Sequence, residues 1–286
     1  MPGGIRLIAC AALLVAAPAS FAAPIGVADD FEDEIVGTFP NGWLDVGALN
    51  PDAPNPPLPS AIVVATTDAL GNPTQALALV DAVAESQGIY RVVPQSVRYT
   101  SRADVRIDRY ADAGQNATTV SDWAMQVGVN RRVGTTDLAF VPSVGVFAST
   151  LTEGWRLYVT TENVYVDLDL GVAATLGTWY TVEVDLDVVA ATVRSLILET
   201  ASGNVLADVT TLLSAFGPWD ASVDGVFDVE GFFDGELTGS GPGNLVVIDN
   251  VDQSVVPVTE PASLALLALG LAGLGRVRRR RWSAAG

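Results

Sequence analysis

Hydrophobic and polar residues alternate one by one along several stretches of the chain. The longest covers residues 96–108, where apolar side chains and a single serine occupy one face and charged or hydroxyl side chains the other. Residues 123–129, 164–170 and 180–188 repeat the pattern. A period of two residues is typical of strands with one buried and one solvated face, as in antiparallel sheets. Helical periodicity is weak, so the pattern predicts an all-β domain.

Both ends of the chain have the patterns of export signals rather than of a folded domain. Residues 1–22 combine an arginine, an apolar stretch and a small final residue, as in a secretory signal peptide. Residues 257–286 contain an uncharged span, 263–275, and an arginine-rich stop, 276–281. As a helix this transmembrane span would measure about 20 Å, against a bilayer core of about 30 Å, which suits a transient anchor. Between the two ends, residues 23–256 are enough for one large β-sandwich.

A short polar motif, Thr259, Glu260 and Pro261, precedes the uncharged span. Together with the span and the arginine stop, it resembles the PEP-CTERM sorting domain of Gram-negative, polysaccharide-producing bacteria. Threonine stands where that family has its first proline. The resemblance implies a precursor anchored in the inner membrane and an exosortase-type membrane transpeptidase that removes the tail. The mature protein would then lie at the cell surface or in the extracellular matrix of a biofilm.

Composition narrows the chemistry of the exported part. The chain has no histidine and no lysine, and its one cysteine, Cys10, lies in the predicted signal peptide. This excludes disulfides, thiol nucleophiles and His-dependent catalytic or metal sites from that part. Residues 23–261, the part that would remain after removal of the signal and the span, contain nine arginines against 33 acidic residues, a net charge of −24, which repels nucleic acid. Carboxylates, hydroxyls and an oxygen-liganded cation such as Ca²⁺ remain as candidates.

Five segments, taken in order, resemble strands and turns of concanavalin A-like (laminin G-like) jelly rolls. The segments are Asp30-Phe31-Glu32, 37–43, 77–81, 177–185 and 247–251. The resemblance spans nearly the whole domain and implies an antiparallel two-sheet jelly-roll sandwich with a lectin-like fold. The galactose-binding-like jelly roll has similar first and last strands and is the alternative.

Three carboxylates alternate along one predicted strand, at Glu183, Asp185 and Asp187. Alternate residues of a strand face the same side about 6.6 Å apart, and glycoside hydrolysis needs two carboxylates about 5–9.5 Å apart. Laminarinase-type jelly rolls use such an array, but their third residue is glutamate rather than aspartate. The favoured interpretation is an exposed acidic strand face, with a weak catalytic array as the alternative.

Acidic residues also mark the first and last predicted strands, at Asp30, Glu32 and Asp249, together with Asn250. These strands are neighbours in jelly rolls, so the four side chains would supply oxygen ligands for Ca²⁺ at one edge of the sandwich. The alternative is a plain acidic edge without a metal.

Arginines recur at every fourth residue of one strand, at Arg98, Arg102 and Arg106, about 13 Å apart. Guanidinium groups bind carboxylates and sulfates bidentately, so this stripe is a candidate binding surface for an acidic polysaccharide. The alternative is pairing with acidic side chains on adjacent strands.

Two function classes remain. The favoured one is an exported, non-enzymatic protein of the cell surface or extracellular matrix, with exopolysaccharide as its candidate ligand. The alternative is a glycoside hydrolase or lyase of the same fold. The aspartate that ends the carboxylate array, and the lack of a clear acid/base pair, favour the first.

Overall fold

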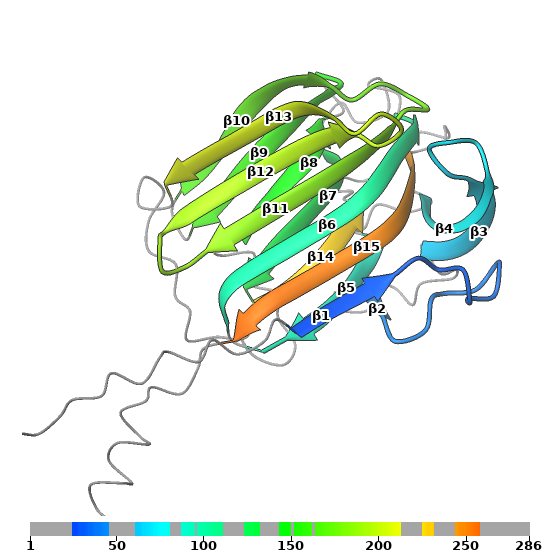
Figure 1. The fold of residues 1–286 in the computed structure, drawn as a ribbon, viewed down its shortest axis with the longest axis horizontal. Coiled ribbons are helices and arrows are strands. Elements are labelled where there is room, and N and C mark those ends of the chain that lie inside the picture. The colour runs from blue at the N-terminus through cyan, green and yellow to red at the C-terminus, as the bar shows by residue number, and fades with distance from the viewer. Residues whose placement is uncertain are drawn as a thin grey trace, which may run out of the picture. The chain divides into compact units, whose positions relative to one another are not determined.

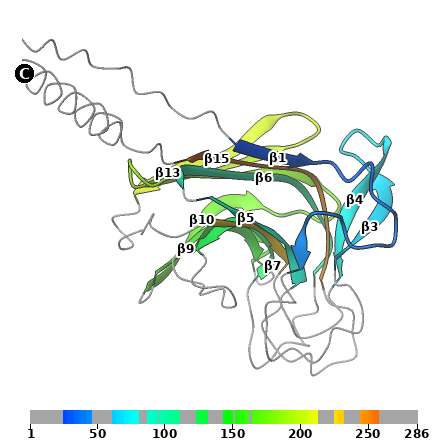
Figure 2. The ribbon, with the colours of Figure 1, turned by 90° about the horizontal axis from the view of Figure 1, so that it is seen from below.

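In the computed structural model the strands of residues 23–258, which form one compact unit, lie in two stacked antiparallel sheets (Figures 1 and 2). The described residues are 25–45, 61–80, 87–94, 96–110, 123–131, 143–149, 152–161, 164–212, 225–231 and 244–257. Within these ranges no helix is long and apolar enough to cross a membrane. The predicted signal peptide and the uncharged span 263–275 lie outside them.

The larger sheet has eight strands, and the last strand of the chain lies at its centre. Its order is β13 (Asn204–Leu212), β12 (Thr192–Glu199), β11 (Trp179–Asp187), β6 (Ser96–Arg109), β15 (Leu245–Pro257), β4 (Pro73–Val80) and β3 (Ala61–Thr67), with β1 (Ile25–Asp29) also paired to β15. Figure 1 shows β1 alongside the second half of β15, and β4 and β3 curling away from its first half.

The smaller sheet has seven strands and packs behind the first. Its order is β10 (Val164–Ala173), β9 (Gly154–Thr161), β8 (Ser143–Ser149), β7 (Trp123–Arg131), β14 (Gly225–Gly231), β5 (Gln87–Val93) and β2 (Leu44–Asp45). All pairings in both sheets are antiparallel, so the predicted fold class, a two-sheet antiparallel jelly-roll sandwich, is confirmed.

The core lies between the inner faces of the sheets. The alternation predicted for β6 is confirmed, because Ala103, Val105 and Ile107 are fully buried while Arg102 on the opposite face is exposed. Trp155 of β9 meets Tyr180 of β11 edge to face, with ring centroids 5.5 Å apart, and so joins the two sheets.

The middle of the seven-stranded sheet departs from the predicted pattern, because it is buried on both faces. Residues 124–129 of β7 and 144–149 of β8 are all buried. The prediction that one face of β7 is solvated was therefore wrong for these residues. The reason is local packing: the ring of Tyr158 lies on the outer face over Gly145 and Gly128. A Cβ at Gly145 would come within 2.5 Å of that ring.

One position of β10 also differs from the expectation. Leu168 belongs to the face predicted to be dry, yet 44% of its surface is exposed. The strand is the outermost one of its sheet, so its side chains have a neighbouring strand on one side only.

A β-bulge interrupts β15 and buries a carboxylate beside it. The register against β6 shifts at this point, and Asn250 adopts a φ of +49°, in the left-handed region. The preceding carboxylate, Asp249, is 3% exposed, accepts a hydrogen bond from the Asn250 N–H at 2.7 Å and lies 3.4 Å from the Thr74 hydroxyl. Burial, reinforced by the charges of Asp104 and Glu32, raises the pKa of Asp249 to about 6.

Substitution of Gly145 by alanine is expected to lower the free energy of unfolding by about 1–3 kcal/mol, because the new methyl group would overlap the Tyr158 ring. Gly128→Ala should cost at least as much, since its Cβ would lie 2.7 Å from the carbonyl oxygen of Val144, which cannot rotate away. Gly26→Ala is the matched control, with its nearest atom at 3.7 Å. Urea unfolding measures the three variants, and equal stabilities would contradict this packing.

Asp249→Asn is expected to gain stability relative to the wild type as the pH rises from about 4 to about 7. The folded-state pKa lies above the ordinary value of 3.8, so between these two pH values the unfolded carboxyl releases its proton while the folded one keeps it. The wild type thereby loses roughly 3 kcal/mol of stability in full. Thermal unfolding at a series of pH values measures the difference. Arg194 lowers the pKa of Asp208 below its ordinary value of 3.8, so Asp208→Asn should lose stability relative to the wild type as the pH rises towards about 4, and change little above that. Parallel curves for Asp249→Asn and the wild type would contradict the burial of a charge.

Candidate functional site

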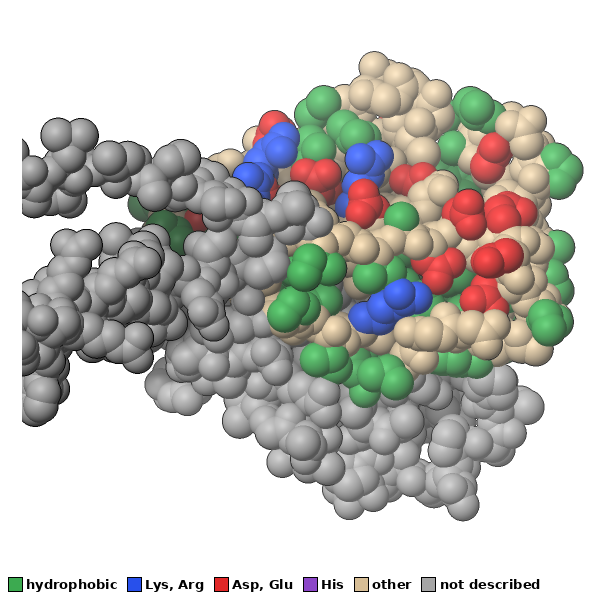
Figure 3. Space-filling model, turned by 60° about the horizontal axis from the view of Figure 1, so that its bottom comes forward, with side chains coloured by type: hydrophobic (Ala, Val, Ile, Leu, Met, Phe, Trp, Pro, Cys, Tyr) green, Lys and Arg blue, Asp and Glu red, His purple; other side chains and the backbone are tan. Residues whose placement is uncertain are grey.

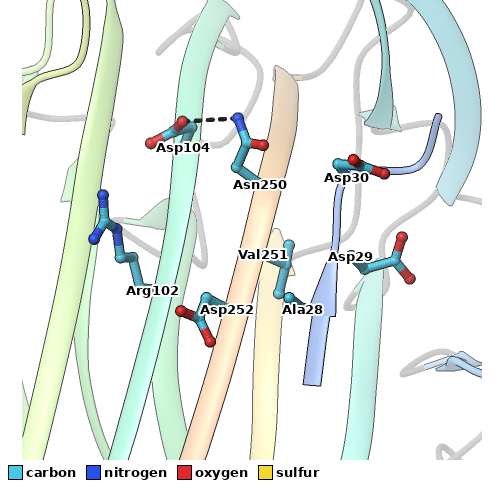
Figure 4. Close-up of a pocket in the computed structure, with 8 residues that line it drawn as sticks. All are labelled: Ala28, Asp29, Asp30, Arg102, Asp104, Asn250, Val251 and Asp252. Atoms are coloured by element: carbon cyan, nitrogen blue, oxygen red, sulfur yellow. Dashed lines mark hydrogen bonds between the residues drawn. The ribbon is translucent and has the colours of Figure 1, made fainter. Parts of the chain in front are cut away.

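An open depression of about 430 Å³ lies on the outer face of the eight-stranded sheet (Figure 4). It unites Asp30, Asn250 and Arg102, which the sequence placed in two separate candidate sites. Its lining residues come from β1 and the residue after it, from β6 and from β15: Ala28, Asp29, Asp30, Arg102, Asp104, Asn250, Val251 and Asp252.

The depression follows from how β15 is shared between two neighbours. β4 pairs with β15 as far as Leu77 opposite Ile248, and β1 pairs from Asp29 opposite Val251. The bulge at Asn250 falls between these two ladders. Among the described residues it therefore has no strand partner on that side, and a hollow opens beside it.

Two hydrogen bonds fix the central carboxylate of the depression. Asp104 accepts one from the Thr181 hydroxyl at 2.6 Å and one from the Asn250 side-chain amide at 3.0 Å. The second bond links β6 to the bulge of β15, as the dashed line in Figure 4 shows. Asp104 and the amide of Asn250 are thereby held in place before any ligand arrives.

The side chains of Arg102 and Asp252 have no hydrogen bond or ion pair with any described residue, although both lie on the acidic outer face. Arg102 has a carboxylate residue as its register partner on each side, Glu183 on β11 and Asp252 on β15. Neither carboxylate comes within ion-pair distance of it. Figure 3 shows how acidic side chains outnumber the few arginines on the face in view. The guanidinium and Asp252 are therefore available to a ligand.

Asp29 contributes to the wall of the depression but not to its chemistry. Its carboxylate accepts a hydrogen bond from Trp43 Nε1 at 2.6 Å and lies 3.5 Å from the Arg91 guanidinium, which stacks on the Trp43 ring. Figure 4 shows the side chain pointing away from the other lining groups. Asp29 is a structural anchor for the first strand.

The other two arginines of the predicted stripe have partners within the sheet. Arg98 forms a bidentate pair with Asp185, with Nε at 2.8 Å. Arg106 forms a second bidentate pair with Asp108, at 2.7 and 2.9 Å, and lies over the ring of Trp179. Anion binding by the whole stripe stays a prediction, and its described geometry leaves only the middle arginine unpaired.

The carboxylate array of β11 shares one face as predicted, but each member has a local partner. Asp185 is held by Arg98, and Glu183 lies 3.6 Å from Arg194. Asp187 accepts a hydrogen bond from the backbone N–H of Ala190 at 2.7 Å, at the turn into β12. Glycoside hydrolysis needs a proton donor and a free carboxylate or base. In this array all three carboxylates are engaged by neighbouring groups of the protein instead.

The residues predicted to bind calcium do not form a compact ligand set. Glu32 accepts hydrogen bonds from the Thr74 hydroxyl and the backbone N–H of Gln75, which fasten the loop after β1 to β4. Asp249 is buried beside it, whereas Asp30 and Asn250 line the depression. Within the described ranges, no group of three or more Asp, Glu, His or Cys side chains could hold a metal ion. Calcium binding stays a prediction.

Two acidic residues of the depression that the proposed binding chemistry uses, Asp104 and Asp252, were not assigned to a site from the sequence. Asp104 stands on the outward face of the alternating strand 96–108, which was the available signal. For Asp252 the sequence offered no such signal. Simple alternation along the strand from Asp249 would place the Asp252 side chain on the inner face, and only the extra residue of the bulge places it on the outer face.

Comparison with protein families identifies the end of the chain. Residues 257–281 match the PEP-CTERM protein-sorting motif, which includes the predicted motif residues Thr259, Glu260 and Pro261. These three residues lie outside the described part of the structure. The motif implies exosortase-dependent processing of an exported, membrane-anchored precursor. No curated protein sequence matches the chain.

Solved structures resemble the sandwich at low sequence identity. A protein of unknown function from Shewanella oneidensis is 12% identical with a TM-score of 0.51, covering 84% of this chain and 91% of its own. A cellulose-induced protein, Cip1, is 13% identical with a TM-score of 0.50, covering 82% and 99%. Peanut lectin is 11% identical with a TM-score of 0.43, covering 83% and 100%. At such identities the likeness concerns the fold alone, and the chain combines a jelly-roll sandwich with a PEP-CTERM protein-sorting motif.

Proposed function

We propose that this protein is a non-enzymatic component of the cell surface or extracellular matrix whose sandwich binds exopolysaccharide. The observation that carries the proposal is the sorting motif at 257–281, which comes directly after a jelly-roll domain. A protein that is exported, anchored and then released from its tail works outside the membrane, where polysaccharide is the abundant polymer of a matrix. The depression beside the β15 bulge is the surface proposed to bind it.

The chemistry of the depression suits sugar hydroxyls. Carboxylates accept hydrogen bonds from hydroxyls, an arginine donates to them, and an asparagine amide does both. The hollow also falls in the size range of small-molecule sites, about 300–1,000 Å³. Asp30, Asp104 and Asp252 give it more negative than positive charge, since Arg102 is its one cation. A neutral glycan is therefore favoured over an anionic one, which the carboxylates would repel.

The contacts of the β11 array support binding without catalysis. Its most buried carboxylate, Asp185, is 8% exposed and ion-paired with Arg98. Arg98 contacts both oxygens of this carboxylate, so neither oxygen is free to exchange a proton with a substrate. The alternative, a glycoside hydrolase or lyase, would have to draw its acid from elsewhere in the chain.

Arg102→Met is expected to weaken binding of a neutral polysaccharide roughly tenfold or more, because it removes charged hydrogen bonds and keeps the aliphatic stem. Asp252→Asn should weaken binding as well. Asp187→Asn, on the same face but outside the depression, is the matched control. Affinity electrophoresis of residues 23–258 in dextran, galactan and a soluble cellulose derivative, with alginate as the acidic comparison, measures the effect. Each gel is run with Ca²⁺ and with a chelator, which also tests the calcium prediction.

Unchanged binding by Arg102→Met and Asp252→Asn would contradict this assignment. Release of reducing ends from the same polysaccharides, abolished by Glu183→Gln, would favour the enzymatic alternative instead.

The sorting tail is expected to be absent from mature protein. Mass spectrometry of the native protein should detect peptides of the sandwich and none beyond Pro261, because the motif directs removal of the apolar span and the arginine stop. A predominant form that extends to Gly286 would show that the tail acts as a permanent anchor.

A further inference from the structure

The sorting motif begins on a strand of the folded domain. The motif match starts at residue 257, and Pro257 is also the last residue of β15. The predicted motif residues Glu260 and Pro261 come only three and four positions later. An extended chain covers at most about 3.6 Å per residue, so no more than about 11–14 Å of chain length separates these residues from the end of the strand. The domain and its sorting signal are joined without an intervening linker.

Residues just before the motif are already paired on both edges. Val255 is opposite Tyr99 of β6 on one side and Ile25 of β1 on the other. Its side chain is 1% exposed and belongs to the main hydrophobic core. An enzyme that takes an extended peptide by adding backbone hydrogen bonds needs unpaired N–H and C=O groups. In the folded sheet, Val255 is flanked by a strand on each side and therefore has no open backbone edge to which an enzyme could bind.

The pairing of β15 with β6 becomes irregular where the sorting motif begins. The register against β6 shifts between Val256 and Pro257, so the last pair of the ladder is irregular. Proline also has no N–H and cannot donate a ladder hydrogen bond. Strand ends of this kind open at little cost, whereas a buried and doubly paired residue opens rarely. Val255 therefore marks the boundary between a loose end and a firmly held strand.

We propose that the last three residues of β15, Val255–Pro257, unpair from β6 and β1 before the tail is cut. The pairing and burial of Val255 then limit how often the processing enzyme gains access to its motif. The folded domain thereby slows its own release from the membrane. This proposal depends on the sorting motif and not on glycan binding.

Pulse-chase of the full chain in a host that contains the processing enzyme tests the proposal through the half-life of the precursor. A six-residue Gly-Ser linker between Pro257 and Val258 is expected to shorten the half-life about tenfold, equivalent to about 1.4 kcal/mol of strand opening that is no longer needed. Val255→Ala should shorten it several-fold without a linker and have no effect with one. Val193→Ala, the same substitution at a buried position of β12 in the same sheet, is the control and should leave the half-life unchanged.

An unchanged or longer half-life in the linker variant would overturn the proposal, because the enzyme would then accept or require the intact strand end. Equal acceleration by Val255→Ala and Val193→Ala would overturn it too, since global rather than local opening would be limiting. A wild-type chain that is never processed would remove its premise, and polysaccharide binding by residues 23–258 would be unaffected by that result.

Discussion

The pairing of β15 with its neighbours is the constraint on which the rest of this structure depends. The final strand of the domain lies at the centre of the eight-stranded sheet, with β6 along one side and β4 and β1 along the other. The change of neighbour from β4 to β1 requires a break, and the bulge at Asn250 occupies it. That break produces both the burial of Asp249 and the hollow beside Asp104.

Electrostatic pairing decides which polar groups of the outer face remain available. Arg98 and Arg106 neutralise Asp185 and Asp108, and Arg194 lies between Glu183 and Asp208. On a surface with this excess of carboxylates, an arginine without a partner is the exception. Arg102 is such a case, since both strands that flank it present acidic residues that do not reach it. The described part of this sheet face therefore contains structural ion pairs together with an arginine and an aspartate, Arg102 and Asp252, that are free to bind.

The regular part of the fold could be predicted from the sequence, and its irregular parts could not. Strict alternation placed β6 and β11 correctly, because a period of two residues on a long strand leaves little choice of face. It failed at Tyr158 and Gly145, where an aromatic ring covers the outer face of the sheet through a contact that is local in space but not in sequence.

The candidate site shows the same limit. Asp30, Arg102 and Asn250 were recognised as polar groups on neighbouring strands, but they were assigned to two separate sites. Their union depends on the extra residue of the bulge, which has no sequence signature and which also turns Asp252 outward. The sequence pattern also cannot predict which arginines form ion pairs. Arg98, Arg102 and Arg106 have equivalent positions along the strand, and only the residues on neighbouring strands distinguish them.

The central place of the last strand also sets the order of folding events during synthesis. Ile25 pairs with Val255, so β1 cannot pair with β15 until some 230 more residues have been synthesised. Contacts so distant in sequence form slowly, and no earlier part of the chain can complete the eight-stranded sheet. A domain arranged in this way remains open during synthesis, and it closes only when its final strand has been made. The topology therefore delays completion of the fold until synthesis of the domain is nearly complete.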